Sequence, residues 1–424
     1  MKKTLYSSDY GIEPNGLTDV TGKLQQLIDD AGASEGKAVV QRGIYLTGSL
    51  FLRSHMELYL DEGAILLGSK NEVAYPLMQT RAAGIEMEWM GALLNAIDCE
   101  DIVISGTGTL DGQGEIWWEK FWGKDRKGGM CSEYEKMGLR WAADYDCLRP
   151  RLIQLRNCKN VVCKDFHLTR SGFWNLHICY CSHVLVQGVW ITNAQGPSTD
   201  GIDIDSCCDV LIEDCDISCN DDNIVIKSGM NADGMRVNRI CEKVEVRDCT
   251  LREGMGLAFG SDMAGGMDEI YLHDIHFIGT DNGVYIKSSK IRGGFIDHTR
   301  VEDLDMINVD FAINLNTNWF PDFSYPVIPK NYQGKIPKRW ELLTEKVPEG
   351  KGMPQVKNMV IKNLTSSYEE NYTGRSTAFF IQAFDENPIQ NIQMENVKIC
   401  AKEFGSIHQV KNINMKDVEI TIRS

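Results

Sequence analysis

The sequence predicts an all-β protein, a single-domain right-handed parallel β-helix that spans residues 1–424. Three observations support this prediction. A short apolar pattern with a turn-forming residue near its centre recurs through most of the chain, a second apolar pattern recurs beside it, and few helix signals interrupt either one. Sandwiches and propellers are disfavoured, because their repeats are hairpins closed by tight two-residue turns.

The first pattern reads apolar-x-apolar-x-(Asp/Gly/Asn)-apolar-x-apolar. Successive copies begin about 21 to 34 residues apart, which is the range expected of solenoids. The alternation predicts strands with one buried face and one open face. The clear copies begin at Val161, Val184, Val210, Val244 and Ile270, their fifth positions are Asp165, Gly188, Asp214, Asp248 and Asp274, and weaker copies begin at Ile102, Thr299, Met359, Ile392 and Ile413.

The second pattern is a pair of apolar residues separated by one position. It indicates that each turn of the coil carries at least two short strands with a bend between them. The pairs are Leu176-x-Ile178, Ile202-x-Ile204, Ile224-x-Ile226, Leu257-x-Phe259 and Val284-x-Ile286.

The first hundred residues hold one convincing helix, at 18–33, which Asp19 or Thr21 could cap. Its apolar stripe is Leu24, Leu27 and Ile28. Strand-like segments follow at 38–41, 44–46 and 56–60. Two long inserted loops are predicted near 113–151 and 317–354, and both are rich in aromatic residues that could stack on sugar rings or pin the loops to the coil.

Composition excludes several functions. A net charge of −16 argues against nucleic acid as a partner, because phosphate binding needs basic patches. No stretch approaches the roughly 18 apolar residues of a membrane span. The start, MKKTLYSSDYGI, lacks the apolar run of a secretory signal, so we expect a cytoplasmic protein whose 14 cysteines are reduced and mostly buried. No metal or cofactor is expected.

Two acidic clusters precede the second and third pairs of the second pattern. Asp200 and Asp222 both lie two residues before the first isoleucine of their pair, and Asp221 lies beside this column. Strands of adjacent turns are about 4.8 Å apart, so these carboxylates should crowd together with Asp203 on an open face. Like charges that close raise at least one pKa, which supplies an acid and a base at neutral pH. Solvated turn aspartates or a calcium site are the alternatives.

The motifs TDGID (199–203), NDDNIVIKSG (220–229), GMGLAFGS (254–261) and NGVYIKS (282–288) resemble those of the polygalacturonases of glycoside hydrolase family 28. YLTGSLFLRS (45–54) and GTGTLDGQG (106–114) extend the likeness, which covers residues 9–316. The resemblance implies an inverting hydrolase on a pectin-lyase-like β-helix. In the family pattern Asp221 would be the general acid and Asp200 with Asp222 would activate water, with acid and base about 6.5–9.5 Å apart.

The same resemblance suggests how the substrate is held. Lys287 matches the lysine that binds a uronate carboxylate, and Arg292 begins a stretch common among bacterial members. Two positions depart from the pattern: Met255 replaces a histidine and Tyr285 replaces an arginine that would form a bidentate clamp. His177 shares the outward column of Asp203 and Tyr285 and could line the cleft.

These observations predict a hydrolase that removes α-linked galacturonic acid from pectin-derived oligosaccharides. Exo action on homogalacturonan or rhamnogalacturonan fragments is favoured. The alternatives are a calcium-dependent pectate-type lyase, which would use the aspartates as metal ligands, and a non-catalytic glycan-binding β-helix. The expected partner is an oligosaccharide, with no nucleic acid and no membrane.

Overall fold

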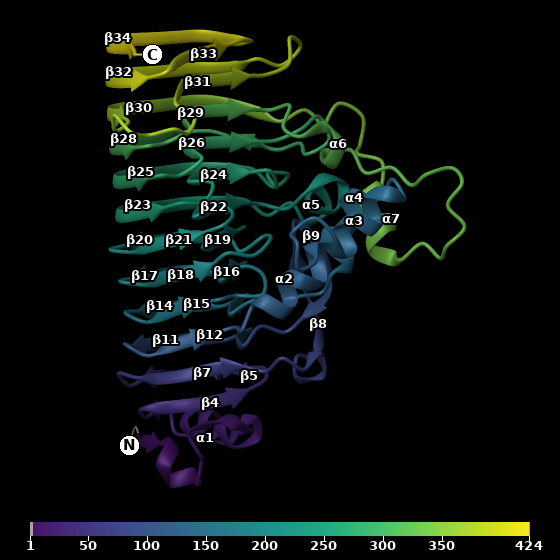
Figure 1. Ribbon diagram of the computed structural model, residues 1–424, viewed down its shortest axis with the longest axis vertical. Coiled ribbons are helices and arrows are strands. Elements are labelled where there is room, and N and C mark those ends of the chain that lie inside the picture. Colours follow the sequence, from purple (N-terminus) through teal and green to yellow (C-terminus); the bar gives the residue numbers. More distant parts are fainter. Residues whose placement is uncertain (1–2, 424) are drawn as a thin grey trace.

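The computed structural model, which describes residues 3–423, is a right-handed coil of parallel strands that climbs from the N-terminus to the C-terminus (Figure 1). Two long parallel sheets form its walls, called sheet A and sheet B here. Strands of adjacent turns pair in a regular register, as the repeat predicts, apart from shifts between β18 and β21 and between β2 and β4. The segment MKKTLYSSDYGI, which was expected to lack a secretory signal, lies partly outside the described residues. From Thr4 onward the chain forms β1, which pairs with β3.

Sheet B has eleven strands, each contributed by one turn. From the N-terminal end they are β5 (Leu50–Phe51), β10 (Leu94–Ile97), β13 (Ile153–Arg156), β16 (Leu176–Cys179), β19 (Ile202–Asp205), β22 (Ile224–Lys227), β24 (Leu257–Gly260), β26 (Asn282–Lys287), β29 (Phe311–Asn316), β31 (Thr377–Gln382) and β33 (Glu403–Ile407).

Sheet A has 21 strands and carries the first sequence pattern. They are β1 (Thr4–Tyr6), β2 (Asn15–Asp19), β3 (Lys37–Val40), β4 (Gly43–Thr47), β6 (Met56–Leu60), β7 (Ala64–Gly68), β11 (Glu100–Gly106), β12 (Thr109–Asp111), β14 (Lys159–Lys164), β15 (His167–Thr169), β17 (Ser182–Gln187), β18 (Trp190–Ala194), β20 (Cys208–Glu213), β21 (Asp216–Cys219), β23 (Cys241–Arg252), β25 (Met267–Ile278), β27 (Phe295–Ile296), β28 (Thr299–Ile307), β30 (Gln355–Ser367), β32 (Ile389–Ala401) and β34 (Val410–Ile422).

The register confirms both patterns. Val161, Val184, Val210, Val244 and Ile270 are vertical neighbours, and the file continues through Thr299, Met359, Ile392 and Ile413. The fifth position bends sheet A outward in every turn, because its residue adopts the left-handed conformation: φ is 69° at Asp165, 64° at Gly188 and 55° at Asp214. Asp, Asn and Gly tolerate that conformation best, which explains the composition of the position.

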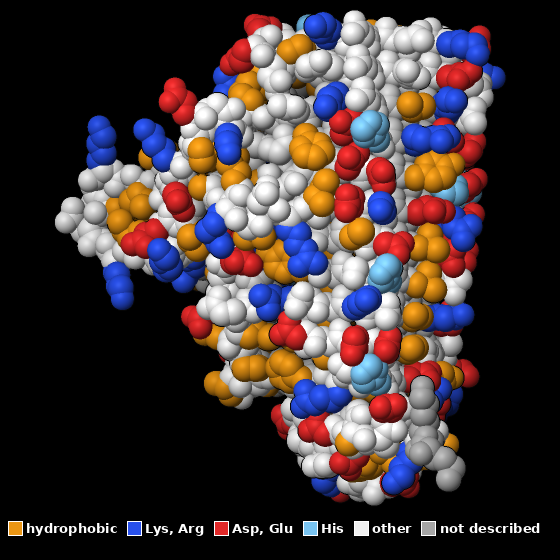
Figure 2. All heavy atoms as spheres, turned by 180° about the vertical axis from the view of Figure 1, so that it is seen from behind, with side chains coloured by type: hydrophobic (Ala, Val, Ile, Leu, Met, Phe, Trp, Pro, Cys, Tyr) orange, Lys and Arg blue, Asp and Glu red, His pale blue; other side chains and the backbone are white. Residues whose placement is uncertain are grey.

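The exterior of the coil carries acidic, basic and histidine side chains in files along its long axis (Figure 2). Stacking in register superimposes equivalent outward positions, so like residues align. All 14 cysteines are free, and all but Cys131, Cys208 and Cys400 are buried. In the described residues no helix is long and apolar enough to cross a bilayer.

The predicted N-terminal helix is α1 (Thr21–Ala33), which closes the N-terminal end of the coil with Leu24, Leu27 and Ile28 buried. Asp19 accepts a hydrogen bond from the backbone N–H of Thr21 at 2.9 Å. The predicted strands 38–41, 44–46 and 56–60 correspond to β3, β4 and β6.

The predicted inserts near 113–151 and 317–354 both contain short helices, which make up more than half of the first insert and a smaller part of the second. These helices bury aromatic side chains such as Trp117 and Trp340 that an extended loop would leave in water. The helices are α2 (Glu115–Trp122), α3 (Gly129–Lys136) and α4 (Arg140–Asp146) in the first insert, and α6 (Pro321–Ser324) and α7 (Lys338–Thr344) in the second.

The inserts lie together on one side of the coil, beside the antiparallel hairpin β8 (Leu77–Ala82) and β9 (Ile85–Met90) and the helix α5 (Asn231–Val237) (Figure 1). One carboxylate joins the two inserts. Asp146 accepts hydrogen bonds from the Tyr134 hydroxyl at 2.8 Å, the Trp340 indole at 3.1 Å and the Arg339 guanidinium. Trp340 also packs edge-on against Trp141, with ring centroids 5.5 Å apart.

Candidate active site

Three carboxylates converge at the outer face of sheet B. Asp200 precedes β19, and Asp221 and Asp222 precede β22, the next strand of the sheet. One oxygen from each of the three lies within 4.8 Å of the others. The stacking of turns therefore brings together residues about twenty positions apart, as the shared offset of Asp200 and Asp222 predicts.

Two lysines compensate the charge of these acids. Lys287 Nζ lies 2.6 and 2.9 Å from the two carboxylate oxygens of Asp222. Lys227 Nζ lies 2.9 Å from Asp203 and 3.2 Å from Asp200, and it sits 4.1 Å from the centre of the Trp174 ring. Asp221 has no ion pair among the described residues.

Burial decides how the acids titrate. The pKa of Asp221 is raised to about 8, chiefly by burial and then by the nearby charges of Asp200 and Asp222, while Lys287 and Lys227 oppose the shift. Burial likewise raises the pKa of Asp200 well above its usual value, although Lys227 opposes the shift. The carboxylates of Asp222 and Asp221 raise the pKa of Lys287 even though burial alone would lower it. Asp221 is thus protonated at neutral pH, close to the ammonium groups of Lys227 and Lys287.

Close backbone contacts fix the loop that carries the acids. The Asn223 side chain donates to the Ile217 carbonyl at 2.9 Å and accepts from the backbone N–H of Gly256 at 2.8 Å. Gly256 has φ of 83°, and a Cβ there would lie 1.8 Å from the Asn282 carbonyl oxygen. The glycines around Met255 therefore permit adjacent turns to approach closely enough to align the acids.

The acids lie at the base of a cavity of about 410 Å³. Its walls come from the coil and from both inserts, and they include Phe121, Trp122, Arg126, Arg140, Trp174, Met255, Lys287, Arg292, Trp319, Phe320 and Phe323. Trp122 and Trp319 are thus placed where a sugar ring could contact them. Trp117 and Trp118 are buried and pin the first insert to the coil, whereas the buried Trp141 packs against the second insert.

The outward face of sheet B is not open, contrary to the prediction. His177, Asp203 and Tyr285 share one outward column, as the register predicts. His177 and Asp203 are fully buried and Tyr285 nearly so, because the inserts and the β8–β9 hairpin cover this face. None of the three lines the cavity. His177 does not line the cleft as the outward column suggests it could.

These covered residues support the site from below. Asp205 forms a buried ion pair with Arg81 at 2.7 Å, and His177 lies 3.6 Å from the same carboxylate. Burial lowers the pKa of His177 to about 3, so its ring is neutral. Tyr285 packs with Trp319, and its ring centre is 5.4 Å from Lys287 Nζ.

Arg292 lines the cavity and is buried. Its Nη1 donates to the Asn231 side chain at 2.7 Å, and its Nε is buried without a hydrogen-bond partner. No carboxylate of the described residues pairs with it, so part of its hydrogen-bonding capacity remains free for a ligand. Lys290 differs, because it points away to Glu386 at 3.0 Å.

Lys227 is the main site residue that the sequence prediction missed. It follows Ile224-x-Ile226 just as Lys287 follows Val284-x-Ile286, and the register places it in the same file, two turns below Lys287. The shared offset was the available signal. Arg81 could not be found this way, because it comes from a hairpin outside the repeat.

The three carboxylates could hold a metal ion by geometry alone. Two ammonium groups already bind two of these carboxylates, since Lys287 contacts both oxygens of Asp222 and Lys227 contacts Asp200. A calcium ion would have to displace them. The donor set therefore fits proton transfer better than metal binding.

Comparison with known proteins decides the family. The model of glycosyl hydrolases family 28 matches residues 78–324. The chain belongs to this family. It is a glycoside hydrolase with the parallel β-helix of family 28, as the motifs predict.

Relatives share most of the chain. A probable polygalacturonase of Vitis vinifera is 30% identical, over 73% of this chain and 62% of its own length. An endo-polygalacturonase of Pectobacterium carotovorum subsp. carotovorum is 25% identical, over 93% of this chain and 87% of its own length. Among solved structures, an exopolygalacturonase of Thermotoga maritima has a TM-score of 0.81 and 25% identity over 99% of this chain and 92% of that one.

The nearest oxygens of the three acids lie within 4.8 Å of one another. This is a distance between single oxygens, whereas the about 6.5–9.5 Å expected for an inverting pair separates whole carboxyl groups. The acids belong to adjacent turns, whose spacing is close to the distance between neighbouring strands. A gap of this size still admits one water hydrogen-bonded to an oxygen on either side, at roughly 2.7–2.8 Å each.

Proposed function

We propose that this family 28 enzyme removes terminal α-linked galacturonic acid from pectin-derived oligosaccharides, with inversion at the anomeric carbon. The observation that carries the proposal is the trio of acids in a cavity that also presents Lys287 and Arg292. The similar proteins include an endo-polygalacturonase and an exopolygalacturonase.

The roles of the acids follow from their partners. Asp221 pairs with neither lysine and has a raised pKa, so it is protonated at neutral pH and gives its proton to the leaving oxygen. Asp200 and Asp222 hold the attacking water between them, and one of them accepts its proton as the oxygen bonds to the anomeric carbon. The lysines keep these two carboxylates oriented.

The uronate carboxylate is held by Lys287 and Arg292. Tyr285 takes the place of the arginine that the family pattern would supply, and its buried ring offers no clamp. Arg292 reaches the cavity from the segment after β26 with an unpartnered Nε. An arginine with free donors is suited to a carboxylate, which it can bind through two parallel hydrogen bonds.

The burial of the outward face of sheet B supports exo action. The outward residues Asn95, Gln154 and His177, which lie on the turns before the acids, are fully buried. A polymer could not extend along the sheet in that direction. The fourteen free cysteines fit a reducing compartment, and hence a cytoplasmic enzyme acting on short imported fragments.

Exo action predicts that tetragalacturonate yields monogalacturonate and trigalacturonate in equal amounts at early times, with no digalacturonate. The Asp146→Asn variant should release digalacturonate as well, because it weakens the junction between the two inserts that close the cavity. Chromatography of early time points measures both results. Glu341→Gln, on the exposed side of α7 with only the Lys338 pair to lose, is the matched control and should behave as wild type. Digalacturonate among the early wild-type products would contradict exo action.

The pH profile tests the role of Asp221. Because its pKa is raised to about 8, the acid is protonated below that pH and loses its proton above it. We therefore expect kcat/KM to fall tenfold per pH unit above about pH 8. A profile measured on tetragalacturonate, with circular dichroism to exclude unfolding, checks this limb. A basic limb near pH 5 would contradict the assignment.

A further inference from the structure

The two ends of the coil are finished differently. At the N-terminal end α1 covers the core, whereas no helix or loop of the described residues lies over the last turn, formed by β33 and β34 (Figure 1). Core-facing residues there remain in water. Met415 is 42% exposed and Ile422 is 48% exposed, while Met394 and Ala401, directly below them on β32, are each 1% exposed.

The uncovered apolar surface is bordered by an unpaired strand edge. β34 is 13 residues long and pairs along one side with β32. Its other edge presents free backbone donors and acceptors next to Phe404, which is 47% exposed. Long edges of this kind bind further strands unless something blocks them. The edge is therefore a surface on which a further strand could pair.

A second copy of β34 fits this edge in a defined register. An antiparallel pair with its two-fold axis between Asp417 and Val418 sets 413 opposite 422, 415 opposite 420 and 416 opposite 419. The first two pairs join core-facing apolar residues, Ile413 with Ile422 and Met415 with Ile420. A two-fold axis that points out of the core keeps the inner faces of both copies on the same side, so these side chains would meet.

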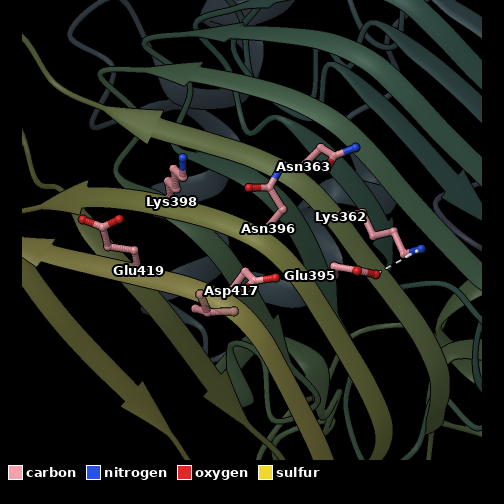
Figure 3. Close-up of a pocket in the computed structure, with 8 residues that line it drawn as sticks. Lys362, Asn363, Glu395, Asn396, Lys398, Asp417 and Glu419 are labelled. Atoms are coloured by element: carbon pink, nitrogen blue, oxygen red, sulfur yellow. Dashed lines mark hydrogen bonds and ion pairs between the residues drawn. The ribbon is translucent and has the colours of Figure 1, made fainter.

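The third pair is complementary in charge. Lys416 and Glu419 flank the bend at Asp417, where φ is 53°. Figure 3 shows this bend, with Asn363, Asn396 and Asp417 along its corner and Lys398 and Glu419 on one wall. Within one chain Glu395 already binds two lysines, Lys362 at 3.3 Å and Lys416 at 2.5 Å.

Glu419 has no ion pair among the described residues, so Lys416 of a second copy could be its cationic partner. We propose that the protein forms a two-fold dimer in which the β34 strands of two copies pair antiparallel and join the coils end to end. The cavity belongs to turns β19–β26, so it stays open in this dimer.

Multi-angle light scattering tests the dimer at micromolar concentrations. We expect the wild-type mass to be twice that of one chain, and Met415→Lys to give a monomer of unchanged turnover per chain. Leu17→Lys, which changes an exposed apolar residue at the other end of the coil, should remain dimeric. A monomeric wild type, or a Met415→Lys variant that stays dimeric, would overturn the proposal.

A charge exchange tests the register without touching the apolar surface. Lys416→Glu and Glu419→Lys should each raise the dissociation constant, and the double variant should restore it, because the opposite charges meet again across the axis. Sedimentation velocity measures the three constants, and circular dichroism confirms folding. A double variant no tighter than the singles would overturn the proposed pairing.

Discussion

Replacing Asp221 with asparagine is expected to lower kcat by roughly 10²–10⁴-fold, the usual contribution of a general acid. The amide is nearly isosteric and keeps the oxygen that accepts from the backbone N–H of Asp222 at 3.0 Å, but it has no proton to give to the leaving oxygen. Steady-state kinetics on tetragalacturonate measures the loss, and calorimetry with the same oligosaccharide should show that binding persists.

Stability separates lost chemistry from lost folding in this variant. Folding raises the pKa of Asp221, so this carboxyl contributes fully to stability only at pH values below the pKa that it has in the unfolded chain. The contribution is lost as pH rises through about 8. Asp221→Asn should therefore unfold at a higher temperature than wild type at pH 9, and at the same temperature at low pH.

Asp248→Asn is the matched control for Asp221→Asn, since it makes the same change at an exposed bend of the coil where either residue tolerates positive φ. It should leave turnover unchanged. Full activity in Asp221→Asn would remove this residue from the reaction.

Replacing Lys287 with methionine should impair both stability and activity. The change leaves the buried Asp222 carboxylate without its cation, which costs about 3–5 kcal/mol for a buried pair. It also removes a charge-assisted contact to the uronate, about 1.5–3 kcal/mol, or roughly ten- to hundredfold in kcat/KM. Thermal unfolding and steady-state kinetics measure the two effects.

Lys290→Met is the control for this change. It lies three residues further on and loses only the exposed pair with Glu386, which is worth about 0–1 kcal/mol. A substrate whose carboxylate has been reduced to a hydroxymethyl group separates the two roles of Lys287. The penalty should be smaller on that neutral substrate; an equal penalty on both would mean that Lys287 acts only through Asp222.

Much of the fold could be predicted because each turn repeats the same local physics. Asp165, Asp214 and their equivalents adopt positive φ at one position per turn, and the apolar residues on either side have one buried face. Once those bends are aligned, the register follows without further information. The column of Asp200 and Asp222 is a direct consequence of that register, which is why the acids could be placed together from offsets alone.

The enclosure of the site could not be predicted in this way. Asp146 meets Arg339 and Trp340 across about 190 positions of chain, and Arg81 meets Asp205 across about 120. Neither contact belongs to the repeat, so no periodicity reports it. These contacts cover His177 and Asp203, which the alternation of the strand alone would leave in solvent.

The amino-acid sequence by itself determined the coil, its register and the family, because backbone bends and alternating burial are local properties that recur in every turn. Only the tertiary structure decided which outward residues face a cavity, since that depends on where two non-repeating inserts pack. It also showed that Lys227 binds Asp200 and that Lys287 binds Asp222. Asp221 is thus left without an ion pair among the described residues and can hold a proton.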